Sequence, residues 1–229
     1  GRDPARRGPG DRLLNPSALP VRGAVAVVVA HRPGVDGPSD VLTPLLGVPI
    51  VLRAVRALLA SGSVDRVVLV VDLEAEATAR QLVDGLPVSV HTDAHEAARC
   101  AQTSGPIVLH DAARPLASPA LAVAVTDAVV AGHAVAVPVL ALSDTVKRVD
   151  VAGVVVGTPD RRDLRVVQTP QAFRAGLLGT AVLAKVLAST EPLEQAWAVA
   201  GEPAVTVPGH PLAFAVRSVW ERELAEVLG

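Results

Sequence analysis

The chain has 229 residues, of which 50% are hydrophobic and 19% are charged, a balance that supplies a packed core and excludes global disorder. Its 21 basic and 23 acidic residues leave a net charge of −2, which excludes charge-driven binding to nucleic acid or to an anionic membrane. A single cysteine excludes a disulfide framework and a cysteine-rich zinc site.

Residues 1–22 differ in composition from the rest of the chain. They hold five arginines and four prolines but no apolar run, which predicts a flexible tail and not a signal peptide. The apolar run at residues 23–30 is far shorter than the about 20 residues that span a bilayer. Residues 23–229 contain neither a repeat nor a linker, so we expect one cytoplasmic domain over this range.

From residue 23 onward, β-branched runs alternate with helical patterns, which is typical of an open, mostly parallel α/β sheet with ligands near the carboxyl ends of its strands. The predicted strands are Ala24–Val29, Arg66–Val71, Val88–His91, Ile107–His110, Ala134–Val137 and Ala204–Val207. The predicted helices are Pro49–Ser61, Glu74–Val83, Ala94–Thr103, Pro119–Ala131 after the N-cap Ser118, and a last helix through Glu226 after the N-cap Ser218.

Residues 146–158 break this rhythm. Two valine-rich stretches, Val146–Val149 and Val154–Val156, flank a turn at Asp150–Gly153, which predicts a β-hairpin. No predicted helix covers this hairpin. We therefore expect a protruding arm that packs on the second subunit of a homodimer.

The clearest chemical signal lies at the end of the central predicted strand, where Asp111 and Arg114 follow one another closely. A carboxylate at this edge suits ribose hydroxyls or a metal, and arginine suits phosphate. The alternative is a structural ion pair of Asp111 with Arg114 or Arg161. Downstream, Thr145, Arg161 and Thr169 add groups that suit a small, polyhydroxylated and phosphorylated ligand.

Four motifs occur in a fixed order: H-D-A-A-R-P at 110–115, D-T-x-K at 144–147, T-x-D-R at 158–161 and Q-T-P-Q-x-F at 168–173. In this order they resemble the 2-C-methyl-D-erythritol 4-phosphate cytidylyltransferases of the non-mevalonate isoprenoid pathway, from about Gly23 to the C-terminus. The resemblance implies a Rossmann-like nucleotidyltransferase sheet, an arm that embraces a second subunit, and Mg²⁺ if the protein is active. It further implies that the methylerythritol phosphate pocket is lined by Asp111, Arg114, Thr145, Arg161 and Thr169, with Ala112 near the nucleotide.

The nucleotide loops depart from that family pattern. Where the family has A-A-G-x-G-x-R and then Pro-Lys, residues 29–40 read V-A-H-R-P-G-V-D-G-P-S-D, so that Asp40 replaces a cation. Pro33 and Pro38 remove amide donors from this loop. Only Ala30, His31 and Arg32 remain as candidate nucleotide contacts.

Two further nucleotide-side motifs are altered. The glycines, arginine and serine of a second family loop are replaced at residues 91–99, and Ala215 takes the place of a lysine near the C-terminus, with Arg217 two residues further on. Removing one charge-stabilising donor costs about 10²–10³ in kcat. The sequence therefore predicts weak or absent activity with CTP.

Two other functions remain open. One is a non-catalytic paralogue that binds a phosphorylated metabolite or a protein partner; the other is a nucleotidyltransferase for a different nucleotide or sugar phosphate. No catalytic residue is assigned and, without activity, no cofactor is expected. His91 and His95 have helical ligand spacing but no third ligand nearby, so no metal site is predicted. Trp197, Trp220 and Cys100 are expected to pack in the core.

Overall fold

The structure is a computed structural model that describes residues 23–30, 42–189 and 193–229. The predicted flexible tail at residues 1–22 lies outside this range. So do five loop residues on which the sequence interpretation rests: His31, Arg32, Pro33, Pro38 and Asp40.

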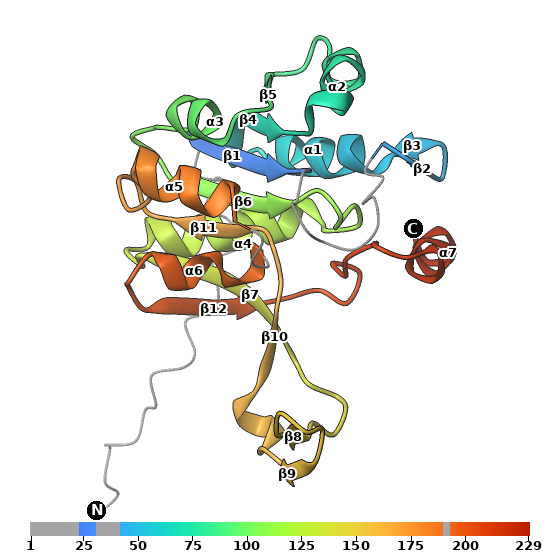
Figure 1. Ribbon diagram of the computed structural model, residues 1–229. Helices are drawn as coiled ribbons and strands as arrows, with labels where there is room; N and C mark the ends of the chain where they lie inside the picture. The colour runs from blue at the N-terminus through green and yellow to red at the C-terminus, as the bar shows by residue number, and fades with distance from the viewer. Residues whose placement is uncertain (1–22, 31–41, 190–192) are drawn as a thin grey trace, which may run out of the picture.

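An eight-stranded sheet crosses the molecule in the order β10-β7-β11-β6-β1-β4-β5, with β12 paired to β7 (Figure 1). Pairing is parallel between neighbours among β5, β4, β1 and β6, and between β7 and β12. In contrast, β10 and β11 are antiparallel to their neighbours. The bounds are β1 (Ala24–Val29), β4 (Val64–Val70), β5 (Val88–His91), β6 (Ile107–Asp111), β7 (Val135–Ala141), β10 (Arg165–Val167), β11 (Gln171–Phe173) and β12 (Ala204–Pro208). The mostly parallel α/β sheet expected from the sequence is confirmed.

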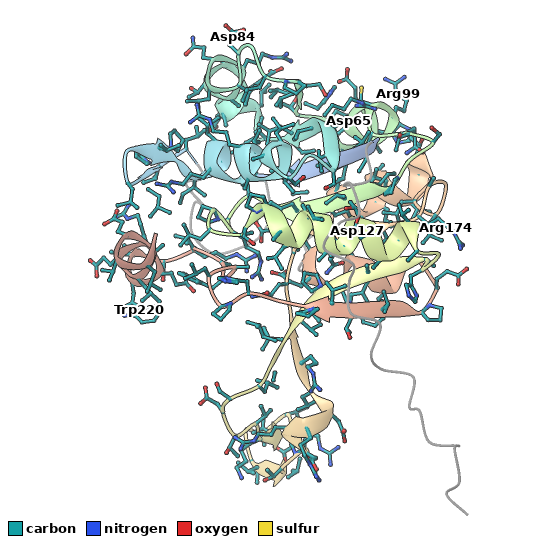
Figure 2. All side chains as sticks on the ribbon, turned by 180° about the vertical axis from the view of Figure 1, so that it is seen from behind. Asp65, Asp84, Arg99, Asp127, Arg174 and Trp220 are labelled. Carbon is teal, nitrogen blue, oxygen red and sulfur yellow. The ribbon has the colours of Figure 1, made fainter. Side chains whose placement is uncertain are left out.

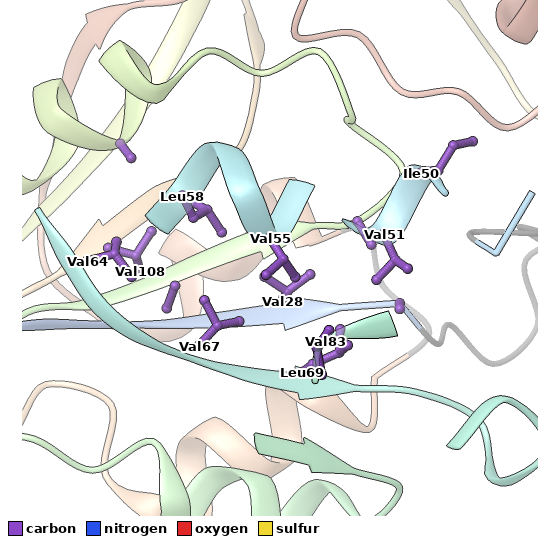
Figure 3. Close-up of a cluster of buried hydrophobic side chains, with 14 of the residues drawn as sticks. Val28, Ile50, Val51, Val55, Leu58, Val64, Val67, Leu69, Val83 and Val108 are labelled. Carbon is purple, nitrogen blue, oxygen red and sulfur yellow. The ribbon is translucent and has the colours of Figure 1, made fainter. Parts of the chain in front are cut away.

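Both faces of the sheet at β1 are buried. Successive side chains of a strand point to opposite faces, so one strand contributes to the core on each side. All six residues of β1 are buried, and they divide between two core clusters: Ala24, Ala26 and Val28 in one, Val25, Val27 and Val29 in the other. Figure 3 shows part of the first cluster, where Val28 lies with Val55 and Leu58 of α1. This alternation explains why β1 reads as a continuous apolar run.

Helices cover both faces. α1 (Ile50–Ala60), α2 (Glu76–Leu82) and α4 (Pro119–Val130) contribute to the first cluster, and α3 (Ala94–Cys100), α5 (Thr180–Leu187) and α6 (Ala196–Val199) to the second. Short 3₁₀ turns occur at η1 (Leu73–Ala75), η2 (Arg161–Asp163) and η3 (Leu193–Gln195), and a small ribbon pairs β2 (Pro44–Leu45) with β3 (Val48–Pro49).

The C-terminal helix α7 (Val219–Leu228) stands beside the sheet and begins after the N-cap Ser218 (Figure 1). The hydroxyl of Ser218 accepts a hydrogen bond from the Glu221 N–H at 3.2 Å, and it lies 2.9 Å from the Glu221 carboxylate. The Ser218 hydroxyl thus satisfies a backbone N–H that has no partner within the first turn of the helix. The N-cap predicted at Ser218 is confirmed.

The predicted arm is a hairpin of β8 (Arg148–Val149) and β9 (Val155–Gly157), which projects from the sheet below β7 and β10 (Figure 1). The side chain of Asp150 closes its turn by accepting N–H groups of Ala152 and Val154, both at 2.9 Å. Five valines of the arm are exposed: Val149, Val151, Val154, Val155 and Val156.

Three core expectations are wrong. Cys100 is exposed at the end of α3, and the side chains of Trp197 and Trp220 are 38% and 67% exposed. Figure 2 shows Trp220 on the outer side of α7. For Trp220 the reason is that Ala225 is the buried residue of α7, which leaves Trp220 open to solvent.

Candidate functional site

The central strand β6 places Asp111 at the carboxyl edge of the sheet. Asp111 is the last residue of β6, pairs with Val29 at the end of β1, and is only 2% exposed. Its backbone N–H donates to the Thr169 hydroxyl at 3.1 Å, and its Oδ1 accepts the Ala113 N–H at 2.9 Å. Asp111 is therefore held from both its backbone and its carboxylate.

Four charged side chains converge here, and we call them the ion cluster: Asp111, Arg114, Glu194 and Arg217. Asp111 Oδ2 accepts a hydrogen bond from Arg217 Nη2, and that nitrogen lies 3.7 Å from Glu194 Oε1. The same Glu194 oxygen accepts from Arg114 Nη2. Two carboxylates thus alternate with two guanidiniums, and the net charge of the cluster is zero.

The partners within the cluster differ from those that the sequence suggested. Asp111 pairs with Arg217, and not with Arg114 or Arg161. The turn after β6 directs the Arg114 side chain toward the C-terminal segment, where its Nη1 also donates to the Ala213 carbonyl. Its side chain is 9% exposed, and among the described residues its Nε has no hydrogen-bond partner.

Glu194 is a site residue that the sequence interpretation missed. It lies in η3, and the carbonyl of its backbone accepts a hydrogen bond from Gln171 Nε2 at 2.8 Å. Burial alone would raise the pKa of Glu194, but the charge and hydrogen bond of Arg114, with the charge of Arg217, hold the pKa below its ordinary value. The carboxylate therefore stays ionised at neutral pH.

Thr169 and the glutamines of Q-T-P-Q-x-F fix backbone positions beneath the cluster. Thr169 is fully buried, and its hydroxyl contacts both the Asp111 N–H and His110 Nδ1. The Gln168 side chain bonds the backbone of His210, donating to its carbonyl at 2.9 Å and accepting its N–H at 3.0 Å. This motif joins β11 to the segment that precedes α7.

The arm residues of the predicted pocket do not reach the cluster of their own chain. Arg161 Nη1 donates to the Ser143 carbonyl at 2.6 Å, and Lys147 Nζ donates to the Thr158 hydroxyl at 2.8 Å. Within the described part of the chain, no hydrogen bond joins Thr145 or Arg161 to the ion cluster. The structure brings together Asp111, Arg114 and Thr169, but not the two arm residues.

Of the residues predicted to contact a nucleotide, the structure describes Ala30 and Ala112. The N–H of Ala30 donates to the Val70 carbonyl at 2.8 Å, and that of Ala112 donates to the Val29 carbonyl at 3.0 Å, so neither amide is available to a phosphate. Ala30 and Ala112 nevertheless lie at the ends of the adjacent strands β1 and β6, beside Asp111.

A separate cavity of about 540 Å³ opens between α2 and β5. Its lining includes Arg80, His91 and Glu96, and His91 Nδ1 lies 3.7 Å from the Glu96 carboxylate. Over residues 23–30, 42–189 and 193–229, no group of three or more metal-binding side chains gathers. Within the same ranges, no helix combines the length and the apolar character that a membrane span requires.

An open sheet covered on both faces, with a charged cluster at the carboxyl edge of its strands, defines a Rossmann-like α/β protein, a class in which ligands bind at that edge. Comparison with known proteins makes the assignment specific. Residues 25–228 match the family described as 2-C-methyl-D-erythritol 4-phosphate cytidylyltransferase, and the chain belongs to that family.

Curated relatives agree with this assignment, and solved structures share the fold. Proteins named 2-C-methyl-D-erythritol 4-phosphate cytidylyltransferase from Nocardia farcinica and Rhodococcus jostii are 41% and 37% identical; each comparison covers 89% of this chain, and 93% and 94% of the relative. The crystal structure of 4-diphosphocytidyl-2C-methyl-D-erythritol synthase from Anaerococcus prevotii shares the fold, with a TM-score of 0.73, 20% identity and coverage of 90% of this chain and 98% of that one. That of the cytidylyltransferase from Thermus thermophilus has a TM-score of 0.66 at 23% identity and covers 91% and 98%.

Proposed function

We propose that the protein transfers the cytidylyl group of CTP to 2-C-methyl-D-erythritol 4-phosphate. A phosphate oxygen of the methylerythritol substrate bonds to the α-phosphorus of CTP, the bond from that phosphorus to the bridging oxygen breaks, and pyrophosphate leaves. The observation that carries the proposal is the pair of Arg217 with Asp111 at the carboxyl edge of β6. It supplies a cation close to the position where Ala215 replaces the family's lysine.

Arg217 suits this role because it is the more accessible guanidinium of the ion cluster. Its side chain is 32% exposed, against 9% for Arg114. Negative charge on the α-phosphate grows as the bonds exchange, and a guanidinium binds phosphate oxygens through two parallel hydrogen bonds. Arg114 is enclosed by Glu194 and the Ala213 carbonyl. Its role in this proposal is to hold Glu194 in place, and it does not bind the substrate.

The described residues do not form a metal site by themselves. Both carboxylate oxygens of Asp111 are engaged, Oδ1 by the Ala113 N–H and Oδ2 by Arg217. Mg²⁺ bound by proteins commonly takes one or two carboxylates and the phosphates of its nucleotide. We therefore assign Mg²⁺ to the CTP that enters.

We further propose that the protein is a homodimer joined by the arm, residues 146–158, in which Thr145 and Arg161 reach the ion cluster of the other subunit. The exposed arm valines support an apolar contact, and the arm lies away from β6 of its own chain (Figure 1). Val155→Asp should convert the dimer to a 23 kDa species in sedimentation at micromolar concentration. Val130→Asp, at a similarly exposed valine of α4, should leave the dimer intact. A monomeric wild type would refute this part of the proposal.

A non-catalytic function is the second candidate. It is favoured by the neutral ion cluster, in which each charge already has a partner within the chain. Pyrophosphate release from CTP, Mg²⁺ and methylerythritol phosphate separates the two. We expect release by the wild type, a fall in kcat of about 10²-fold for Arg217→Ala, and no change for Arg222→Ala in α7. A wild type that binds methylerythritol phosphate but releases no pyrophosphate would establish the second candidate.

A further inference from the structure

His110 precedes Asp111 of the ion cluster in β6. It is 1% exposed in β6, next to Asp111, and its Nδ1 lies 3.1 Å from the hydroxyl oxygen of Thr169. That oxygen already accepts the Asp111 N–H at 3.1 Å. A hydroxyl has one proton to donate, so its proton is available for Nδ1 if that nitrogen carries none.

The surroundings determine which form the ring takes. Burial lowers the pKa of His110 to about 4; the charges of Asp111 and Glu194 oppose this, that of Arg114 adds to it, and a hydrogen bond with the Arg114 backbone also opposes it. The imidazole is therefore neutral at pH 7. The Arg114 N–H donates to the Asp111 carbonyl at 3.1 Å, so the backbone group of Arg114 left to bond the ring is its carbonyl, which can only accept. The ring is therefore the donor, and with Nδ1 facing Thr169 the donor atom is Nε2.

We propose that His110 is a positioning residue of the site: its Nδ1 accepts the Thr169 proton and its Nε2–H donates to the Arg114 backbone, so that one neutral ring holds both Asp111 and Arg114. The backbone of Asp111 is held through Thr169, and that of Arg114 directly. This arrangement changes the role of Thr169 in the predicted pocket. The Thr169 proton is committed to His110, so Thr169 orients Asp111 and donates no hydrogen bond to a ligand.

The tautomer of the His110 imidazole can be measured without an activity assay. In ¹⁵N spectra of the histidine side chains at pH 7, His110 should carry its proton on Nε2 and none on Nδ1. Thr169→Val should shift the His110 Nδ1 resonance to that of a nitrogen without a hydrogen bond, whereas Thr169→Ser should leave it in place. A proton on Nδ1, or a resonance unmoved by Thr169→Val, would overturn the proposal.

The kinetic consequence rests on the proposed cytidylyl transfer. His110→Phe keeps the ring shape and removes both hydrogen bonds, and should lower kcat by about 10²-fold with little change in the KM for CTP. His110→Asn, whose oxygen replaces the Nδ1 acceptor, should recover part of that loss, and His133→Phe at an exposed histidine should match the wild type. Unchanged kcat for a folded His110→Phe would overturn the positioning role.

The two proposals fail in different ways. If the wild type releases no pyrophosphate, the proposed function is wrong, while the ¹⁵N spectra still decide the role of His110. If His110→Phe does not fold, the wild-type and Thr169→Val spectra decide it.

Discussion

Protonation of His110 should make the stability of the fold depend on pH. The pKa of this ring is lowered from 6.5 to about 4 by burial, against the charges of Asp111 and Glu194 and with that of Arg114. Between pH 4 and pH 6.5, His110 therefore binds a proton in the unfolded chain but not in the folded chain. The contribution to stability is therefore complete above pH 6.5 and is lost as the pH falls toward 4.

The size of the effect follows from the pKa difference. A shift of one unit corresponds to about 1.4 kcal/mol, so the loss relative to neutral pH is about 2 kcal/mol at pH 5 and about 3 kcal/mol at pH 4. For a domain of this size, this is a substantial part of a total stability of about 5–15 kcal/mol. His110→Gln removes the titrating group and should remove this pH dependence.

Chemical denaturation at several pH values measures the effect. The free energy of unfolding of the wild type minus that of His110→Gln should decrease by about 3 kcal/mol between pH 7 and pH 4. Because all other groups titrate in both proteins, the difference isolates His110. A difference that stays constant with pH would show that His110 is not buried as a neutral ring, and it would refute the reasoning.

Two further predictions concern stability. Glu194→Gln removes the carboxylate that pairs with the buried Arg114 and should lower the free energy of unfolding by about 3 kcal/mol, measured in urea at pH 7. Glu76→Gln, which breaks an ion pair at the surface, should cost less than about 1 kcal/mol, and equal costs would contradict the burial of the cluster. Leu69→Ala, at a fully buried residue of β4, should lower the melting temperature and reduce the free energy of unfolding by about 3 kcal/mol. Leu73→Ala, at a residue that is 74% exposed, should leave both quantities nearly unchanged.

Much of the fold could be predicted from local patterns. β1 and β5 have the predicted bounds. In β1 the unbroken run of Ala and Val is typical of a strand buried on both faces, and it can be recognised without knowledge of the neighbouring strands. β10 and β11 were not predicted, since three residues are too few to show an alternation, and β11 forms only by insertion between β6 and β7. The helix α5 was missed as well, although its buried face belongs to the second core cluster.

The sequence alone determined one end of the site. It placed Asp111 and Arg114 after a central strand, and it indicated the family through the order of four motifs. Only the tertiary structure decided which charges meet. Arg217 lies 106 residues from Asp111, and Glu194 lies 80 residues from Arg114. No local pattern encodes such pairs, because the order of the strands in the sheet, and not spacing along the chain, brings the segment before α7 and the turn η3 to the end of β6.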